Sequence, residues 1–164
     1  MTYLDTSALI KRFVPEKGSP LVRALVRTDV IATAKIAYAE VYATLTRKKR
    51  EGGLSEAHYG LVCREFELDW QSLIRVDLRD ETLVLARDLI RRHPLRGFDA
   101  VHLASALDLR TETREDITFV AADDRLLRAA QPEGLTVVNP ESAAARRRQP
   151  PPRHALAPRA RARC

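Results

Sequence analysis

Near its start the chain carries the stretch Tyr3-Leu-Asp-Thr-Ser-Ala-Leu-Ile10, which predicts a short apolar strand running directly into a helix. Asp5 stands at the junction and is the only charged side chain before Lys11. An isolated carboxylate in an apolar segment costs free energy unless another group compensates it. Asp5 is therefore a candidate functional residue.

Three further acids stand in stretches without other charges. Glu40 lies in a helical stretch, residues 36–46, and the face that it shares with Ile36, Ala37, Ala43 and Thr44 is predicted to point inward. Asp99 falls at a predicted helix start, where free backbone N–H groups favour an anion. Asp123 ends a strand-like run, so two of the four acids, Asp5 and Asp123, lie at strand-to-helix junctions.

Strand-like and helical patterns alternate along the chain. Strands are predicted near residues 2–5, 29–33, 73–77, 117–122 and 135–138, and helices near residues 7–13, 19–27, 36–50, 55–71, 80–92, 98–110 and 124–130. Strands joined by helices imply a parallel sheet that is covered on both faces, with ligands at the carboxyl ends of the strands. An α/β fold is therefore predicted, with Asp5 and Asp123 at the ligand-binding edge.

The positive net charge belongs to one end of the chain. The 164 residues carry a net charge of +6, but residues 143–164 hold seven arginines and no acid, which leaves −1 for residues 1–142. We expect residues 1–142 to form one domain and the Arg- and Pro-rich segment 143–164 to be a disordered tail. The tail either binds nucleic-acid phosphates loosely or is a solvated extension without a dedicated role.

The composition argues against several classes of protein. Cys63 and Cys164 have no metal-ligand spacing and form no disulfide framework, which excludes a zinc site built from thiolates. No apolar run approaches the length of a membrane span, and the start lacks the basic and apolar segments of a signal peptide. A cytoplasmic protein without a membrane role is expected.

Carboxylates gathered at one edge of a sheet imply a cation. They repel one another, and at neutral pH a bound cation is the usual compensation. Ligands that are all oxygen suit Mg²⁺ or Mn²⁺. Such an ion activates water and offsets charge on a phosphoryl oxygen, so hydrolysis of phosphodiesters is a natural use of an all-carboxylate site.

Each candidate also has a purely structural interpretation. Asp5, Asp99 and Asp123 could be plain helix caps, and Asp123 could also pair with Arg125. Glu40 fits neither role, because a mid-helix acid on an apolar face is not a cap and not an obvious surface residue. His102 is expected to be a partly buried helix residue with a local hydrogen bond rather than a metal ligand.

Two other groups are expected to be mainly structural. The run Arg47-Lys-Lys-Arg50 at a predicted helix end complements the helix dipole, although it could also touch RNA phosphates. Four aromatic side chains are expected to pack between helices rather than to stack on bases; they are Tyr38, Tyr42, Phe66 and Trp70.

Four motifs, taken in order, resemble those of PIN-domain ribonucleases, most closely the VapC toxins. They are Tyr3-Leu-Asp-Thr-Ser-Ala-Leu-Ile-Lys11, Ala39-Glu-Val41, Arg96-Gly-Phe-Asp-Ala-Val-His-Leu-Ala-Ser-Ala-Leu107 and Phe119-Val-Ala-Ala-Asp-Asp-Arg-Leu-Leu127. The resemblance implies a PIN-like three-layer α/β/α sandwich with a mostly parallel central sheet. It also implies a Mg²⁺- or Mn²⁺-dependent endoribonuclease site over residues 1–142.

The resemblance assigns roles to six residues. It implies that Asp5, Glu40, Asp99 and Asp123 form the catalytic and metal-binding cluster. It also implies support from the hydroxyl of Thr6 or Ser7, with Ser7 preferred. Asp123 is preferred over Asp124 because it ends the strand. One departure is Ala121, since a hydroxyl residue often lies two positions before the last acid, so one supporting hydrogen bond is expected to be absent.

Partners follow from the same resemblance. It implies an RNA substrate, a cognate VapB-like antitoxin protein, a homodimer and hence the toxin component of a toxin-antitoxin module. Two alternatives remain at this point. One is a non-catalytic PIN-like module that binds RNA or a protein, and the other is a phosphoacceptor receiver domain, although the acid pair Asp123-Asp124 comes late in the chain for a receiver.

Overall fold

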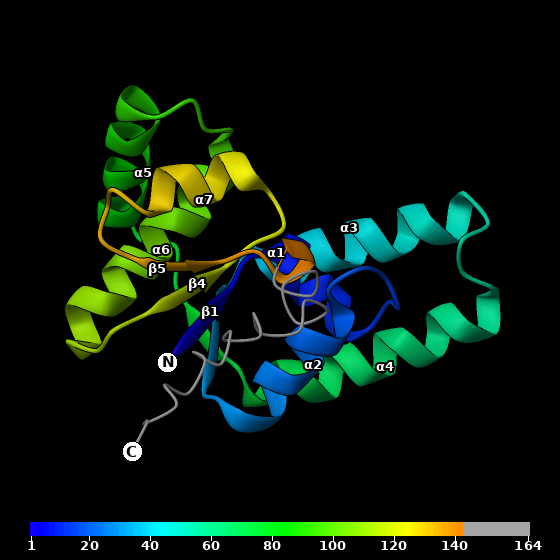
Figure 1. Ribbon diagram of the computed structural model, residues 1–164. Helices are drawn as coiled ribbons and strands as arrows, with labels where there is room; N and C mark the ends of the chain where they lie inside the picture. The colour runs from blue at the N-terminus through cyan, green and yellow to red at the C-terminus, as the bar shows by residue number, and fades with distance from the viewer. Residues whose placement is uncertain (143–164) are drawn as a thin grey trace, which may run out of the picture.

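A five-stranded parallel sheet forms the centre of the computed structural model, which describes residues 1–142 (Figure 1). The strands are β1 (Thr2–Leu4), β2 (Ile31–Ala34), β3 (Ile74–Val76), β4 (Thr118–Val120) and β5 (Thr136–Val138), in the order β3-β2-β1-β4-β5. Every pairing in this sheet is parallel, and the central strand β1 sets Thr2 opposite Ile31 of β2 and Thr118 of β4. The predicted parallel sheet is confirmed.

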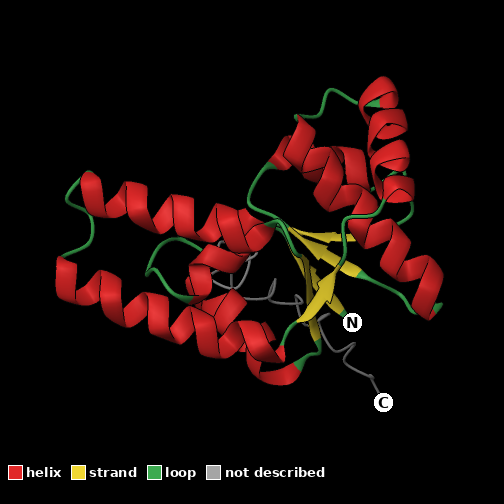
Figure 2. Ribbon diagram, turned by 180° about the vertical axis from the view of Figure 1, so that it is seen from behind, coloured by secondary structure: helices red, strands yellow, loops and turns green. Residues whose placement is uncertain are grey.

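Helices cover both faces of the sheet. They are α1 (Thr6–Leu9) with a following 3₁₀ turn η1 (Ile10–Arg12), α2 (Ser19–Thr28), α3 (Ala37–Arg50), α4 (Glu56–Ser72), α5 (Asp80–Arg92), α6 (Gly97–Thr113) and α7 (Asp124–Ala130). Successive strand residues point to opposite faces. Tyr3 therefore packs into a core with α5, α6 and α7, whereas Leu4 packs into a core with α1 to α4. Figure 2 shows the sheet between these two layers, which is the predicted α/β/α sandwich.

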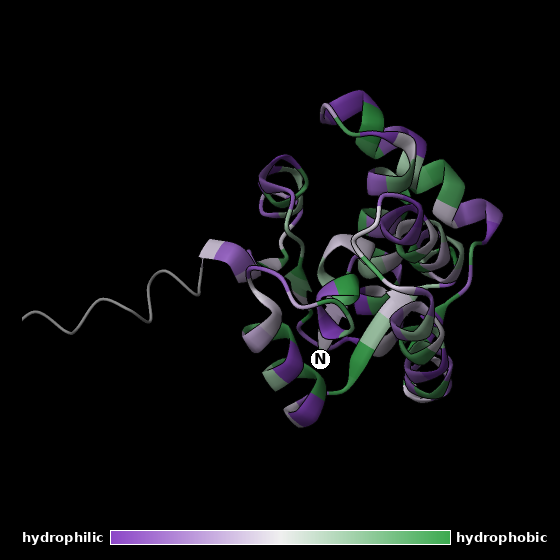
Figure 3. Cartoon of the chain, turned by 90° about the vertical axis from the view of Figure 1, so that its right-hand side faces the viewer, coloured by the Kyte–Doolittle hydropathy of each residue, from purple (hydrophilic) through white to green (hydrophobic). Residues whose placement is uncertain are grey.

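Helices α3 and α4 form a pair that extends beyond the sheet (Figure 1). Tyr38 of α3 lies with its ring centroid 5.6 Å from Phe66 and 5.2 Å from Trp70 of α4, and Tyr42 lies 5.8 Å from Phe66. These contacts confirm that the four aromatic side chains pack between helices. The helices carry hydrophobic and hydrophilic residues in alternating bands (Figure 3), as expected where one face of a helix is buried.

The face of α3 that carries Glu40 differs from the prediction. The buried stripe of this helix consists of Ala37, Val41 and Leu45, which are spaced by one helical turn. Glu40 is half-buried and Ala43 is exposed. The apolar composition of the stretch therefore led to a prediction of too wide a buried face. Glu40 lies beside the buried stripe rather than within it.

The predicted tail, residues 143–164, lies outside the described residues. Within residues 1–142, none of the helices combines the length and the hydropathy needed to cross a membrane.

Candidate active site

Asp5 lies at the carboxyl end of β1 and is the N-cap of α1. It is buried, and its Oδ1 accepts the N–H of Ala8 at 2.9 Å. The Ser7 hydroxyl contacts both Asp5 oxygens, at 2.8 and 2.9 Å, and Ser7 Oγ accepts the N–H of Ala122. Burial raises the pKa of Asp5 above its ordinary value, while the hydrogen bonds from Ala8 and Ser7 oppose the rise. Ser7 thus ties Asp5 to the segment that follows β4.

Glu40 of α3 is held by a chain of hydrogen bonds that crosses three elements. Its Oε2 accepts the Thr6 hydroxyl at 2.6 Å and lies 2.8 Å from His102 Nε2. His102 Nδ1 lies 3.0 Å from the buried Tyr3 hydroxyl. Burial acts to raise the pKa of Glu40, but the hydrogen bonds from His102 and Thr6 outweigh it, so the pKa lies below its ordinary value. Glu40 is therefore held as a carboxylate.

The partners of His102 fix which ring nitrogen donates. A carboxylate only accepts hydrogen bonds, so Nε2 carries a hydrogen toward Glu40. Burial raises the pKa of Tyr3 well above its ordinary value, so its hydroxyl keeps its hydrogen and donates to Nδ1. The local hydrogen bond expected for His102 was wrong, because these partners lie 62 and 99 residues away in the chain.

Asp99 lies in the first turn of α6, and one of its carboxylate oxygens accepts no hydrogen bond within residues 1–142. The N-cap of α6 is Arg96, so Asp99 is not the cap that was considered. Its Oδ2 is buried and has no hydrogen-bond partner within residues 1–142, and the guanidinium of Arg125 lies 4.0 Å away. A buried carboxylate oxygen without a partner is costly. Asp99 Oδ2 is thus the site atom that most needs a cation.

Asp123 caps α7. Its Oδ1 accepts the N–H of Arg125 at 2.7 Å and that of Leu126 at 3.4 Å, and its Oδ2 lies 3.4 Å from the Arg125 guanidinium. Burial acts to raise the pKa of Asp123, but these contacts outweigh it and lower the pKa. Arg125 therefore approaches both Asp99 and Asp123. The neighbouring Asp124 is exposed and accepts the side-chain amide of Asn139 at 2.6 Å.

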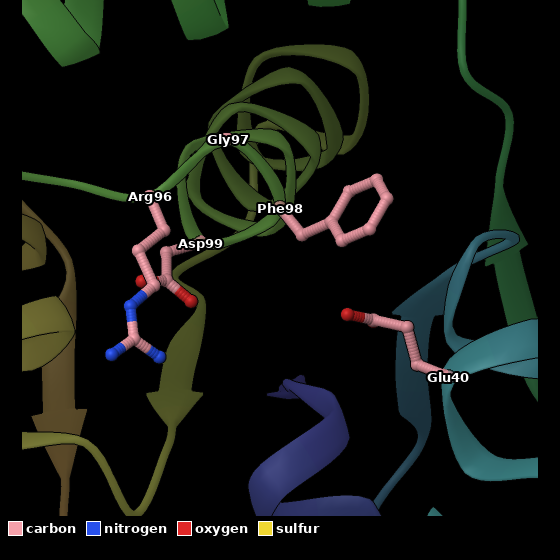
Figure 4. A pocket seen from close by; sticks show the side chains of 5 residues that line it. All are labelled: Glu40, Arg96, Gly97, Phe98 and Asp99. Atoms are coloured by element: carbon pink, nitrogen blue, oxygen red, sulfur yellow. The ribbon is translucent and has the colours of Figure 1, made fainter. Parts of the chain in front are cut away.

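Two hollows share Glu40 and Asp99. The first measures about 390 Å³ and is lined by three acids of the predicted cluster together with basic residues; these are Asp5, Glu40, Asp99, Lys11, Arg47 and Lys48. The second measures about 400 Å³ and is lined by Glu40, Arg96, Gly97, Phe98 and Asp99 (Figure 4). Asp123 is not among the described residues that line either hollow. Three predicted acids thus meet at one cleft, and the fourth is directed toward Arg125.

A second charged cluster borders the first hollow. The buried Lys11 ammonium lies 2.9 Å from Glu16 and 2.8 Å from Glu141, and Lys48 lies 3.3 Å from the other Glu16 oxygen. Two residues of the basic run, Arg47 and Lys48, occupy the last turn of α3 as predicted and also line this hollow. The cleft therefore combines negative and positive side chains.

The donor set fits a hard cation. The three acids of the cleft offer oxygen ligands alone, and Asp99 Oδ2 has no hydrogen-bond partner within residues 1–142. Across residues 1–142, however, no three His, Cys, Asp or Glu side chains lie close enough together to hold a metal ion. Ionised carboxylates repel one another, so these acids are expected to approach more closely around a cation than without one.

Sequence reasoning missed the hydrogen bonds of His102 and Tyr3 and the approach of Arg125 to Asp99, although a pairing of Arg125 with Asp123 had been considered. A signal for His102 was available, because it follows Asp99 by three residues and so lies on the same face of α6. The contact of Tyr3 with His102 depends on how α6 packs against the sheet. The contact of Arg125 with Asp99 depends on the position of α7. Neither can be derived from spacing in the sequence.

Residues 2–132 match the PIN domain family. The chain belongs to the PIN-domain family. Ribonuclease VapC45 of Mycobacterium tuberculosis is 39% identical over 108 residues, which cover 65% of this chain and 75% of that protein. Ribonuclease VapC46 of the same species is 35% identical over 143 residues, covering 84% and 96%. This PIN protein is therefore VapC-like, as its four motifs indicated.

The fold has solved counterparts. A toxin-antitoxin complex from Klebsiella pneumoniae contains a chain that superposes with a TM-score of 0.57 at 16% identity, covering 85% of this protein and 98% of that chain. At this identity the likeness concerns the fold alone. It agrees with the parallel sheet and the two helical layers of the PIN domain described above.

Proposed function

We propose that this PIN protein is a metal-dependent endoribonuclease and the toxin of a toxin-antitoxin module. The observation that carries the proposal is the meeting of Asp5, Glu40 and Asp99 at one cleft, where Asp99 Oδ2 is buried without a hydrogen-bond partner in residues 1–142. Two relatives bear the name ribonuclease, and the matched region covers three quarters or more of each of them.

Asp5, Glu40 and Asp99 are the proposed ligands of Mg²⁺ or Mn²⁺, with Asp123 as a further member. Oxygen ligands favour these ions over softer metals. A divalent ion bound there would supply an activated water and would offset charge on the phosphoryl oxygen. Asp123 stands apart in this set because its carboxylate contacts Arg125 and caps α7.

The remaining residues orient these groups and the RNA. Ser7 and the N–H of Ala8 hold the Asp5 carboxylate, while Thr6 and His102 hold Glu40. These hydrogen bonds restrict the orientation of the Asp5 and Glu40 carboxylates. The exposed Arg47, which lines the same hollow, would attract the phosphate backbone of RNA.

The partners belong to the proposal as well. The solved fold neighbour from Klebsiella pneumoniae is a toxin-antitoxin complex. We extend this to a VapB-like antitoxin protein, a homodimer and a cytoplasmic location. An arginine of the antitoxin would suit the cleft, because a guanidinium pairs well with carboxylates.

Expression in a bacterial host tests the proposal. The wild-type chain should stop growth and produce RNA fragments with new 5′ ends, and a neighbouring short reading frame should restore growth when it is co-expressed. Asp99→Asn is the matched control, since it preserves the shape of the side chain but weakens cation binding. Normal growth and intact RNA with the wild-type chain, at verified expression, would contradict the proposal.

A further inference from the structure

An exposed aromatic ring lies beside the proposed reacting groups. Phe98 directly precedes Asp99 in the first turn of α6 and is 63% exposed. Its ring projects from the start of the helix into the space toward Glu40 (Figure 4). A single exposed apolar side chain is ordinary on a protein surface. This one, however, lines a hollow of about 400 Å³ that it shares with two acids of the cleft.

The lining of this second hollow suits a flat, neutral group. Glu40 and Asp99 would repel a phosphate placed inside it, and Arg96 is the one cation among the lining residues that belong to the described part of the chain. The Phe98 ring offers a π face of the kind on which nucleobases stack. A base can therefore enter where a phosphate would be repelled, while Arg96 is available to the backbone that follows.

We infer that Phe98 forms a stacking subsite for one unpaired nucleobase of single-stranded RNA, next to the bond that is cut. The inference rests on the proposed ribonuclease function and adds to it a residue that positions the substrate. The two hollows share Glu40 and Asp99. A strand that crosses both hollows would present its scissile phosphate to the cation proposed to bind these acids, with one flank near the exposed Arg47 and a base of the other flank on Phe98.

The single-stranded character follows from the geometry of stacking. In a duplex, both faces of a base are covered by its neighbours, so a protein ring can stack only on a base that is unstacked and splayed out. Stacking on one aromatic ring is tolerant of base identity, because every base has a π face. Phe98 thus selects unpaired RNA rather than a particular sequence.

Tryptophan fluorescence tests the stacking directly. The fluorescence of Phe98→Trp, placed in an Asp5→Asn and Trp70→Phe background and kept in chelator to prevent cleavage, should be quenched by short single-stranded oligoribonucleotides of random sequence. An oligomer of the same length without bases should not quench it. Leu68→Trp is the control, because Leu68 is 70% exposed on α4 and belongs to neither hollow. Equal quenching of both variants, or no quenching of either, overturns the inference.

Steady-state cleavage provides the second test. Phe98→Leu should raise KM about 5- to 150-fold, the range for loss of one base stack, and leave kcat nearly unchanged. Phe98→Tyr should restore KM, and Leu68→Ala should match the wild type. If the wild type cleaves RNA and Phe98→Leu has the same KM, the stacking site is wrong while the ribonuclease function stands. If the wild type does not cleave RNA, the function fails, and the fluorescence result still decides whether bases stack on Phe98.

A protein partner on Phe98 would give a different pattern. Phe98→Leu would then keep its KM for RNA but would no longer be neutralised by the antitoxin during growth. That result would overturn the RNA subsite and assign Phe98 to the protein interface.

Discussion

His102 Nε2 lies 2.8 Å from Glu40 Oε2, so a buried imidazole of α6 orients a half-buried carboxylate of α3. The two helices belong to opposite layers of the sandwich. Because the Tyr3 hydroxyl occupies the other ring nitrogen, the imidazole is fixed at both ends. A group held in this way cannot swing away from the carboxylate without breaking a buried hydrogen bond.

Loss of the His102 donor should impair catalysis. His102→Leu is expected to lower activity about 10- to 100-fold, as is typical when a residue that orients a metal ligand is removed. His102→Gln should retain most activity, since its amide places a donor near the position of Nε2. In the wild type, ¹⁵N NMR should report a neutral ring protonated on Nε2. A ring protonated on Nδ1 alone, or equal activity of both variants, would contradict the assigned hydrogen bonds.

Replacement of Asp5 should separate stability from activity. Burial raises the pKa of Asp5 in the folded chain, so its ionised form costs stability above the unfolded-state pKa, and this cost disappears as the pH falls through the folded-state pKa. Asp5→Asn should therefore raise the unfolding temperature of the metal-free protein at pH 7 and abolish cleavage. Thermal unfolding in chelator measures the first effect. A variant that is both less stable and still active would contradict this role.

Removal of Arg125 should strengthen cation binding. Its guanidinium approaches Asp99 and Asp123 and so competes with a metal ion for their oxygens. Partly exposed ion pairs contribute ~0.2–1 kcal/mol, so Arg125→Ala should tighten Mn²⁺ binding roughly 1.4- to fivefold. Titration calorimetry with Mn²⁺ measures the change, and Arg128→Ala on the exposed side of α7 is the control. Weaker binding in Arg125→Ala would show that the arginine supports the site instead.

Lys11 should matter to stability. Its buried ammonium bonds Glu16 and Glu141 at 2.9 and 2.8 Å, and charged hydrogen bonds of this kind contribute ~1.5–3 kcal/mol. Lys11→Ala should lower the free energy of unfolding by about that amount in a urea titration. Lys17→Ala, at an exposed position, should change it by less than ~0.5 kcal/mol. Equal effects of the two substitutions would show that the ion pairs of Lys11 do not contribute to the free energy of unfolding.

Most of the architecture could be derived from the sequence because its signals are local. The strand at residues 2–5 and the helix at residues 80–92 have a clear apolar pattern and clear breaks, and the structure places β1 and α5 there. The helix predicted at residues 7–13 became α1 followed by η1. A hydropathy pattern does not distinguish a 3₁₀ turn from the α-helix that it continues.

The site was predictable only in outline. The acids were found because isolated carboxylates in apolar stretches are rare, and three of them line one cleft. Their supports were not found, because the contact between Glu40 and His102 joins residues 62 positions apart. The direction of Asp123 toward Arg125 depends on the turn that enters α7, and a pairing of this kind was considered only as an alternative.

RNA cleavage by purified protein with defined metal content tests the central claim most directly. Wild-type protein stripped with chelator should leave single-stranded RNA intact and should cut it when Mg²⁺ or Mn²⁺ is restored, while Asp99→Asn should remain inactive with either ion. Circular dichroism would verify that both proteins are folded. Cleavage that persists in chelator, or full activity of Asp99→Asn, would contradict a metal-dependent site built on these acids.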